Sequence, residues 1–302
     1  MTEDNTGYKD LELDGIKRYV VFYFDILGQS DLLLKCQKNY QNVYVEFNEF
    51  SEDQKDLFKK SVHEVVAFRS ILQSSINYAI KNTKARHSHI PDIIIPIRNI
   101  VGSDCMFVTA ELNQTEKSHE ILTLSVLFTA IASAYLGWLD AGIFARGGGC
   151  ISYGITLPDL SNMPGGDYYG PGLACSVKME NEKACFPRII IDANMVNVFK
   201  TNMLKYKNSN NERFVYDLAK FTIDNYTFDN YFIKDEDAQN GHYTLFPHMA
   251  FQFHPLIMTN IYKNINSCIE NSNNDRVAEK YKKLLSMLQQ LEAKLSKNCT
   301  RG

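Results

Sequence analysis

The sequence lacks the cysteine and histidine patterns that stabilise small secreted domains or hold structural zinc. Its seven cysteines are an odd number, lie scattered along the 302 residues and form no Cys-x-x-Cys pair. The seven histidines form no His-Glu-x-x-His motif. We therefore expect reduced thiols, mostly in the core, no disulfide framework and no zinc site, as in a cytoplasmic protein.

A surplus of basic residues is also missing. Lysine and arginine number 32 against 35 acidic residues, which gives a formal net charge of −3. Proteins that coat nucleic acid neutralise phosphates with clustered lysine and arginine, so we expect no nucleic-acid polymer as a partner. A small phosphorylated ligand stays possible, because one nucleotide requires only a metal ion and a few hydrogen-bond donors.

The first 15 residues are polar and acidic, and they predict no signal peptide. One uncharged run of 19 residues, 121–139, is long enough to span a bilayer. Threonine and serine dilute this run, and no cluster of lysine and arginine flanks it closely. We expect a helix buried against a sheet and no membrane span, with the membrane helix as the alternative.

The pattern of apolar residues predicts an α/β protein, more specifically an α+β sandwich of one sheet with helices packed on it. The composition, 45% hydrophobic and 22% charged, is that of a globular chain. The predicted strands are 19–27, 93–97, 105–110, 144–153 and the segment beginning RIII at 188. The predicted helices are those from Ser30-Asp31 to about 81, 121–139, 173–184 and the C-terminal helix after Asn274-Asp275.

Two helices show an apolar face. In the first helical region this face comprises Val62, Val65, Val66, Ile71, Ile76 and Ile80. In the C-terminal helix it comprises Val277, Tyr281, Leu284, Leu285, Leu288, Leu291 and Leu295. We divide the chain into an acidic lead at 1–16, a main domain at 17–206 and a mostly helical C-terminal extension at 207–302.

Two aspartates are candidates for a metal site. Asp25 ends the first predicted strand, and Asp104 lies in the turn between the second and third. If these strands are neighbours, the two carboxylates repel each other unless a cation lies between them. Mg²⁺ or Mn²⁺ suits such oxygen ligands. The alternative is structural: Asp25 caps a helix and Asp104 is an ordinary turn residue.

The residues around Asp25 fit a nucleotide. Gly28 allows the backbone to approach a ligand closely, and the amides from Leu27 through Ser30, Gln29 among them, open a predicted helix N-terminus that can bind phosphate. Tyr23 lies two residues before Asp25, so the two side chains project from the same face of the strand. We expect Tyr23 to reach the ribose or the base.

Four strings occur in order between Tyr19 and Asp192: FYFDILGQSDLL, GSDCMF, ARGGGCISYG and YYGPGLACSVKMENEKACFPRIIID. Together they resemble the class III nucleotidyl cyclases, and most closely the bacterial Pycsar pyrimidine cyclases, which convert UTP or CTP into the cyclic mononucleotide in antiphage defence. The resemblance implies a ferredoxin-like catalytic sheet at 17–206, a homodimer, and a downstream effector that responds to the product without stable contact.

The resemblance also implies roles for individual residues. Asp25 and Asp104 would bind two divalent ions, Mn²⁺ or Mg²⁺, with the Ile26 carbonyl as a backbone ligand. Where purine cyclases carry an asparagine and a transition-state arginine, this sequence has Ala174 and Lys178. Lys178 could supply positive charge without the planar fork of arginine; its alternative is a solvated helix lysine.

The glycine run after Arg146 and the charged pair Glu180 and Arg188 are interpreted as structural. The glycines after Arg146 are expected to allow tight strand packing or close approach of a second subunit, because no P-loop lysine follows. Glu180 and Arg188 match the family strings and are interpreted as an ion pair.

The resemblance thus implies a cyclase that uses a pyrimidine nucleotide, with UTP favoured over CTP, although no single residue decides the base. The missing asparagine motivates the alternative of a catalytically silent, cyclase-like module that binds nucleotide or protein. The diguanylate cyclase branch is disfavoured, because GSDCMF does not provide its Gly-Gly-Asp/Glu-Glu-Phe hairpin.

Overall fold

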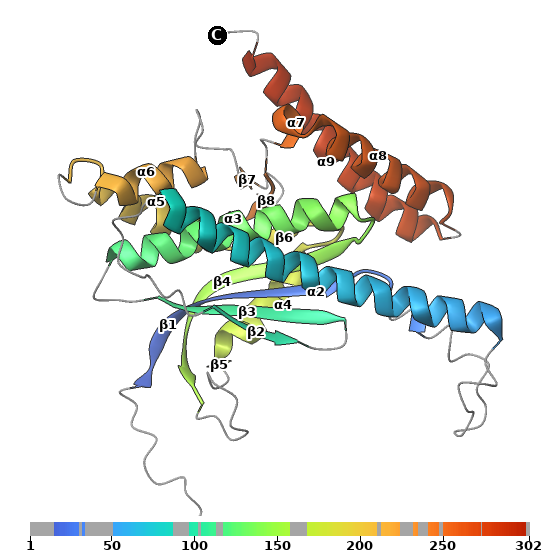
Figure 1. Cartoon of the computed structure of the whole chain (residues 1–302), viewed down its shortest axis with the longest axis horizontal. Helices are drawn as coiled ribbons and strands as arrows, with labels where there is room; N and C mark the ends of the chain where they lie inside the picture. Colours follow the sequence, from blue (N-terminus) through green and yellow to red (C-terminus); the bar gives the residue numbers. More distant parts are fainter. Residues whose placement is uncertain are drawn as a thin grey trace, which may run out of the picture.

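The computed structural model describes residues 15–29, 32–33, 51–86, 97–101, 104–112, 117–157, 168–209, 213–223, 232–234, 241–247, 250–272 and 274–299. Within these ranges the chain forms a mixed sheet with helices packed on both faces, which confirms the predicted α+β class (Figure 1). The strands are β1 Lys17–Ile26, β2 Ile97–Val101, β3 Cys105–Leu112, β4 Ala145–Thr156, β5 Tyr168–Tyr169, β6 Ile189–Ile191, β7 Phe232–Lys234 and β8 Tyr243–Leu245. The helices are α2 Glu52–Arg86, α3 Lys117–Asp140, α4 Pro171–Lys183, α5 Ala193–Lys205, α6 Arg213–Ile223, α7 Ala250–Phe253, α8 Pro255–Glu270 and α9 Asp275–Cys299.

Strand β1 lies in the middle of the sheet. The strand order is β2-β3-β1-β4-β6-β8-β7, with β5 paired on β4. Strand β1 runs antiparallel to both β3 and β4, whereas β4 and β6 are parallel. Strand β2 continues to Val101, past Ile97 where the predicted arm ends, and pairs antiparallel with β3 as the predicted hairpin requires. The rest of the predicted arm, 93–96, lies outside the described residues.

The main core lies on one face of the sheet. Phe22, Phe24 and Ile26 of β1 project into it and are at most 3% exposed. Helix α3 covers this face, and nearly all its residues from Glu120 to Leu139 are buried or half-buried. Among the described residues one stretch, Ser118–Asp140, is long and apolar enough to cross a membrane, but 78% of its most hydrophobic window is buried inside the protein. The prediction of a buried helix is therefore confirmed.

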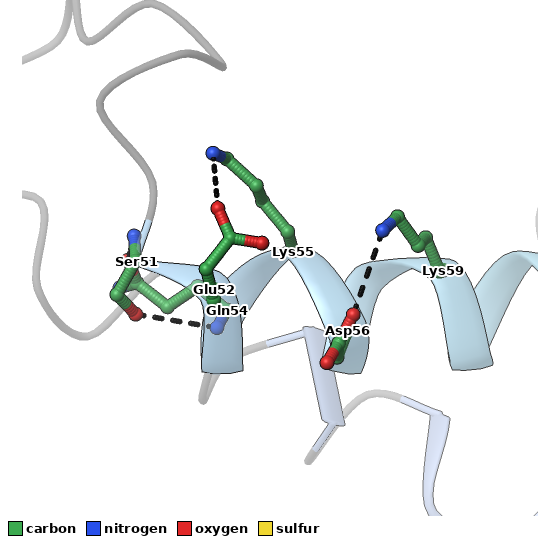
Figure 2. A network of polar contacts seen from close by, with 6 residues as sticks. All are labelled: Ser51, Glu52, Gln54, Lys55, Asp56 and Lys59. Carbon is green, nitrogen blue, oxygen red and sulfur yellow. Dashed lines mark hydrogen bonds and ion pairs between the residues drawn. The ribbon is translucent and has the colours of Figure 1, made fainter.

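Helix α2 begins with a capping box. The Ser51 amide donates to the Gln54 side chain over 2.9 Å, and the Gln54 amide donates to the Ser51 hydroxyl over 3.3 Å (Figure 2). Ion pairs one turn apart, Glu52 with Lys55 at 2.8 Å and Asp56 with Lys59 at 3.5 Å, follow along its exposed surface.

The apolar face predicted for α2 is only partly correct. Its buried residues are Phe68, Leu72, Ile76 and Ala79. Val62 and Val66 are instead 45% and 53% exposed, because the core contact of α2 is set by Phe68, whose ring lies 4.5 Å from that of Trp138 in α3.

The residues after 207 share this sheet and core. Strand β8 pairs with β6, and β7 pairs with β8. Helix α9 begins at the predicted place, where Asn274 caps it by accepting from the Arg276 amide over 2.9 Å. On its predicted stripe Leu284, Leu288 and Leu291 are buried, and the Tyr281 ring packs on Phe144 with a centroid distance of 4.8 Å.

Helix α4 covers the other face of the sheet, and the glycines of β4 set how closely it approaches. A Cβ at Gly148 would lie 2.2 Å from the Ser176 carbonyl oxygen and 3.0 Å from the Glu180 amide. On the core side, a Cβ at Gly147 or Gly149 would overlap the phenyl ring opposite it in β1. The glycines after Arg146 therefore serve tight packing, one of the two roles expected for them.

Replacing Gly148 with alanine should destabilise the fold. The added methyl group collides with backbone rather than with a flexible side chain, so α4 must shift, and such overpacking typically costs about 1–3 kcal/mol. Urea unfolding measures the loss. Gly15→Ala is the matched control, because no atom lies within 4 Å of the position its Cβ would occupy. Equal stability of the two variants would contradict this account of the packing.

Candidate functional site

The alternation of β1 explains how an aspartate ends a strand that is otherwise buried. Side chains alternate between the two faces of a strand, so Asp25 and Tyr23 point away from the core that receives Phe24. They project from the face that α4 covers over the first half of β1, where Val21 is buried. The Asp25 side chain is 23% exposed, so solvent or a ligand can reach it.

The structure brings Asp25 and Asp104 together at one end of two neighbouring strands. Asp25 pairs with Cys105, the residue after Asp104, and the Ile26 amide donates to the Asp104 carbonyl over 3.2 Å. Burial raises the pKa of Asp25 above its ordinary value of 3.8; the Arg146 guanidinium opposes this rise, and the charge of Asp104 adds to it. The charges of the two carboxylates therefore oppose each other.

A buried ion pair borders this site. Arg146 of β4 lies opposite Asp25 in the register, and its Nη2 lies 3.4 Å from Asp25 Oδ2. The same nitrogen lies 2.6 Å from Oε1 of Glu180 in α4, whose side chain is 2% exposed. Burial raises the pKa of Glu180, and Arg146 opposes the rise.

Glu180 thus pairs with Arg146, which corrects the expected pairing with Arg188. The Arg188 guanidinium donates to the Lys183 carbonyl over 2.7 Å and lies over the Phe186 ring.

Tyr23 lies beside Asp25 on the same face, as predicted. Its ring packs against Phe107 of β3 with a centroid distance of 4.9 Å. Burial raises the pKa of the Tyr23 phenol, and the nearby Asp25 charge raises it further, so the hydroxyl stays protonated at neutral pH. Tyr23 can therefore donate a hydrogen bond at the border of the two aspartates.

The loop after Asp25 departs from the prediction in two places. The Leu27 amide donates to the Phe144 carbonyl over 2.8 Å, so it is not open to a phosphate. The Gln29 side chain is buried against α2, where it donates to Glu64 and accepts from Ser61. Gly28 is exposed and has a φ of +88°, a conformation that favours glycine. Of these three residues, Gly28 is the one at which a ligand can approach the backbone.

The structure does not bring Lys178 to the aspartates within one protomer. Its side chain is 71% exposed and its Nζ lies 3.9 Å from Glu182 one turn later. Lys178 and the buried Glu180 are two residues apart in α4, so they project from nearly opposite sides of the helix. Lys178 could act at the site of its own chain only if α4 rotated about its axis by roughly half a turn.

The donor set fits a hard divalent cation. Two carboxylates and the Ile26 carbonyl are oxygen ligands of the kind that Mg²⁺ and Mn²⁺ prefer. The described part of the chain holds no group of three or more His, Cys, Asp or Glu residues that could bind a metal ion. Water and substrate phosphates would therefore supply the remaining ligands, which is usual for Mg²⁺.

Sequence reasoning missed Arg146 and Glu180 as members of the site. Arg146 enters it because β1 and β4 pair in a register that sets it opposite Asp25. Glu180 enters it because α4 lies against Gly148. The available signal was a charged residue at the start of an apolar, glycine-rich strand, where burial requires a partner.

No protein-family model matches the chain, and no curated protein matches it. Among solved structures, it is similar to a bacterial light-regulated adenylyl cyclase at 13% identity and a TM-score of 0.40, over 82% of this chain and 57% of that chain. It is similar to the monomeric guanylyl cyclase domain of the RhoGC fusion protein from the aquatic fungus Blastocladiella emersonii at 10% identity and a TM-score of 0.39, over 76% and 94% of the two chains. A class III adenylyl cyclase-like ATP-binding protein from Pseudomonas aeruginosa matches at 12% identity and a TM-score of 0.40, over 68% of this chain and 43% of that chain. At these values the likeness by itself assigns neither a family nor an activity.

The stability of the metal-free protein should respond to Asp25→Asn in a pH-dependent way. Because the pKa of Asp25 is raised in the folded state, the folded protein holds this proton more tightly than the unfolded chain does. Stability is then lost as pH rises from about 4 through the folded pKa. Asp25→Asn should therefore raise the melting temperature at pH 7–8, and the gain should shrink toward pH 4.

Thermal unfolding in a chelator across this pH range tests the expectation. Asp217→Asn is the control, because Asp217 is exposed on α6 and its pair with Arg213 lies at the surface. A gain that is independent of pH, or a loss at pH 7–8, would contradict the electrostatic account of Asp25.

Proposed function

We propose that the protein is a metal-dependent nucleotidyl cyclase that converts a pyrimidine nucleoside triphosphate into the 3′,5′-cyclic mononucleotide and pyrophosphate. The observation that carries the proposal is the meeting of Asp25 and Asp104 at neighbouring ends of β1 and β3, where the Ile26 amide donates to the Asp104 carbonyl. Two carboxylates at neighbouring strand ends repel each other, a divalent cation relieves that repulsion, and a triphosphate brings such cations with it.

In this reaction the bond from the ribose 3′-oxygen to the α-phosphorus forms, the bond from that phosphorus to the oxygen bridging to the β-phosphorus breaks, and the hydroxyl proton passes to water as pyrophosphate departs. When bound, two divalent ions, Mn²⁺ or Mg²⁺, would lower the pKa of the 3′-hydroxyl and neutralise the departing pyrophosphate. Asp25 and Asp104 hold these ions. Tyr23 offers a protonated hydroxyl for the ribose or base, and Gly28 lets the phosphates approach the backbone.

The proposal includes a homodimer. Lys178 lies on the exposed side of α4, away from Asp25 of its own chain, and an exposed lysine can serve a site on a second subunit. There it would supply the positive charge that the transition state requires, as a point charge.

The pyrimidine substrate rests on the sequence resemblance to the Pycsar cyclases. UTP is favoured over CTP, and the product would act as a second messenger in antiphage defence, in the cytoplasm. A cyclic-nucleotide-responsive effector would act downstream without stable contact.

A catalytically silent module that binds nucleotide or protein is the second candidate. Ala174 stands where the related cyclases carry an asparagine, and Lys178 is paired with Glu182 at the surface. One structural neighbour is itself described as a cyclase-like ATP-binding protein.

Incubation of the purified protein with each of the four NTPs and Mn²⁺ or Mg²⁺, followed by mass detection of the products, tests the proposal. We expect cyclic UMP, or cyclic CMP at a lower rate. Asp25→Ala and Asp104→Ala should each lower turnover at least a hundredfold, because even the partners of metal ligands typically contribute about 10–100-fold. Asp217→Ala, on the exposed side of α6, is the control with unchanged turnover. Absence of any cyclic product under all four nucleotides and both metals would favour the silent module.

Mixing two inactive variants tests the shared site. If each site combines Asp25 of one subunit with Lys178 of the other, a mixed dimer of Asp25→Ala and Lys178→Ala chains contains one intact site. Random exchange in a twofold dimer then restores about a quarter of the wild-type activity. Co-refolded or co-expressed chains provide the mixture. Activity that stays at the level of the single variants would show that the two residues do not act across a dimer interface.

A further inference from the structure

One guanidinium nitrogen at the candidate site contacts two carboxylates. Nη2 of Arg146 lies 2.6 Å from Glu180 Oε1 and 3.4 Å from Asp25 Oδ2. The shorter contact is made with the deeper group, because the Glu180 side chain is 2% exposed and that of Asp25 is 23% exposed. Arg146 is therefore anchored at Glu180 and reaches outward to Asp25.

This arrangement affects any cation that binds Asp25. A divalent ion on that carboxylate would share it with a guanidinium of the same sign, and like charges at this separation repel each other. The 3.4 Å contact between Arg146 and Asp25 must weaken as the ion binds. The guanidinium of Arg146 is expected to stay with Glu180, because breaking that ion pair would leave the buried Glu180 carboxylate without its partner.

We propose that Arg146 is a resident cation that competes with divalent ions for Asp25, and that Glu180 is the positioning residue that holds Arg146 back. The pair thereby sets the metal affinity of the site. This inference rests on the proposed role of Asp25 as a metal ligand, and it assigns the control of that role to two residues of β4 and α4.

Two further features support these roles of Arg146 and Glu180. The Arg146 Nε is buried without a hydrogen-bond partner among the described residues, so the guanidinium keeps donor capacity that the two carboxylates do not use. Gly148 keeps α4 close to β4, with its Cβ position only 3.0 Å from the Glu180 amide. The distance between Glu180 and Arg146 is thus set by backbone packing and not by flexible side chains.

Mn²⁺ binding to the purified protein without nucleotide, measured by electron paramagnetic resonance or calorimetry, tests the proposal. Removing the competing charge with Arg146→Gln should lower the Mn²⁺ dissociation constant about tenfold, an estimate for a partly solvated charge. Glu180→Gln weakens the anchor, so Arg146 turns more fully to Asp25 and the dissociation constant should rise about threefold. Glu182→Gln is the matched control on the exposed side of α4 and should change it less than twofold.

The double variant Arg146→Gln/Glu180→Gln separates competition from a simple loss of negative charge. If Glu180 acts through Arg146, the double variant should bind Mn²⁺ as tightly as Arg146→Gln does, about thirtyfold more tightly than Glu180→Gln alone; independent effects would give only about tenfold. If Glu180 acts only through its own field, the weakening persists in the double variant and the proposal is overturned. The double variant also removes both charges of the buried pair, so it answers the question even where Arg146→Gln leaves Glu180 unpaired and the fold is lost.

The outcomes also distinguish this inference from the proposed function. The competition alone would be overturned by the following result. Mn²⁺ binding is lost in Asp25→Asn, Arg146→Gln binds Mn²⁺ as the wild type does, and the double variant binds it as Glu180→Gln does. A wild-type protein that binds no Mn²⁺, either alone or together with a nucleoside triphosphate, would remove the metal site itself, and with it the proposed cyclase.

Discussion

The pairing of β1 with β3 on one side and β4 on the other is the constraint on which the site depends. Because β1 is flanked on both edges, its backbone is fixed and its alternation is strict: Phe22 and Phe24 fill the core, while Tyr23 and Asp25 face the opposite side. The same two registers bring Asp104 and Arg146 to Asp25 from either side. A register slip of one residue would turn the Asp25 side chain into the core and separate it from Asp104 and Arg146.

The site also shows why a carboxylate survives so close to a packed interior. Asp25 is neither fully buried nor free, and its charge is balanced by a guanidinium that is itself held by Glu180. Charges at such depth are tolerated when each has a partner, and here the carboxylates of Asp25 and Glu180 share the guanidinium of Arg146. The sharing of one guanidinium by two carboxylates is the physical reason for expecting a further cation at this end of the strands.

Much of this could be predicted from the sequence, and the rest depended on contacts between distant segments. The apolar run before Asp25 predicted β1, the uncharged run predicted the buried helix α3, and the leucine stripe predicted α9, because each is a strong local pattern. The hydrophobicity of Val62 and Val66 misled the prediction for α2, since burial follows from which residues meet Trp138 and not from apolar character alone. The Arg146–Glu180 pair could not be predicted, because it depends on the register of β4 and on how closely α4 approaches Gly148. The solvent-facing direction of Lys178 likewise follows from which side of α4 meets the sheet.

The contact between Tyr281 and Phe144 has a consequence for how the chain can be divided. The Phe144 carbonyl accepts the amide of Leu27, two residues after Asp25, while the Phe144 ring rests on Tyr281 of the last helix. The C-terminal helix therefore supports, through Phe144, the backbone directly after Asp25. Trimming the protein to residues 17–206 would remove that support and loosen the backbone directly after Asp25.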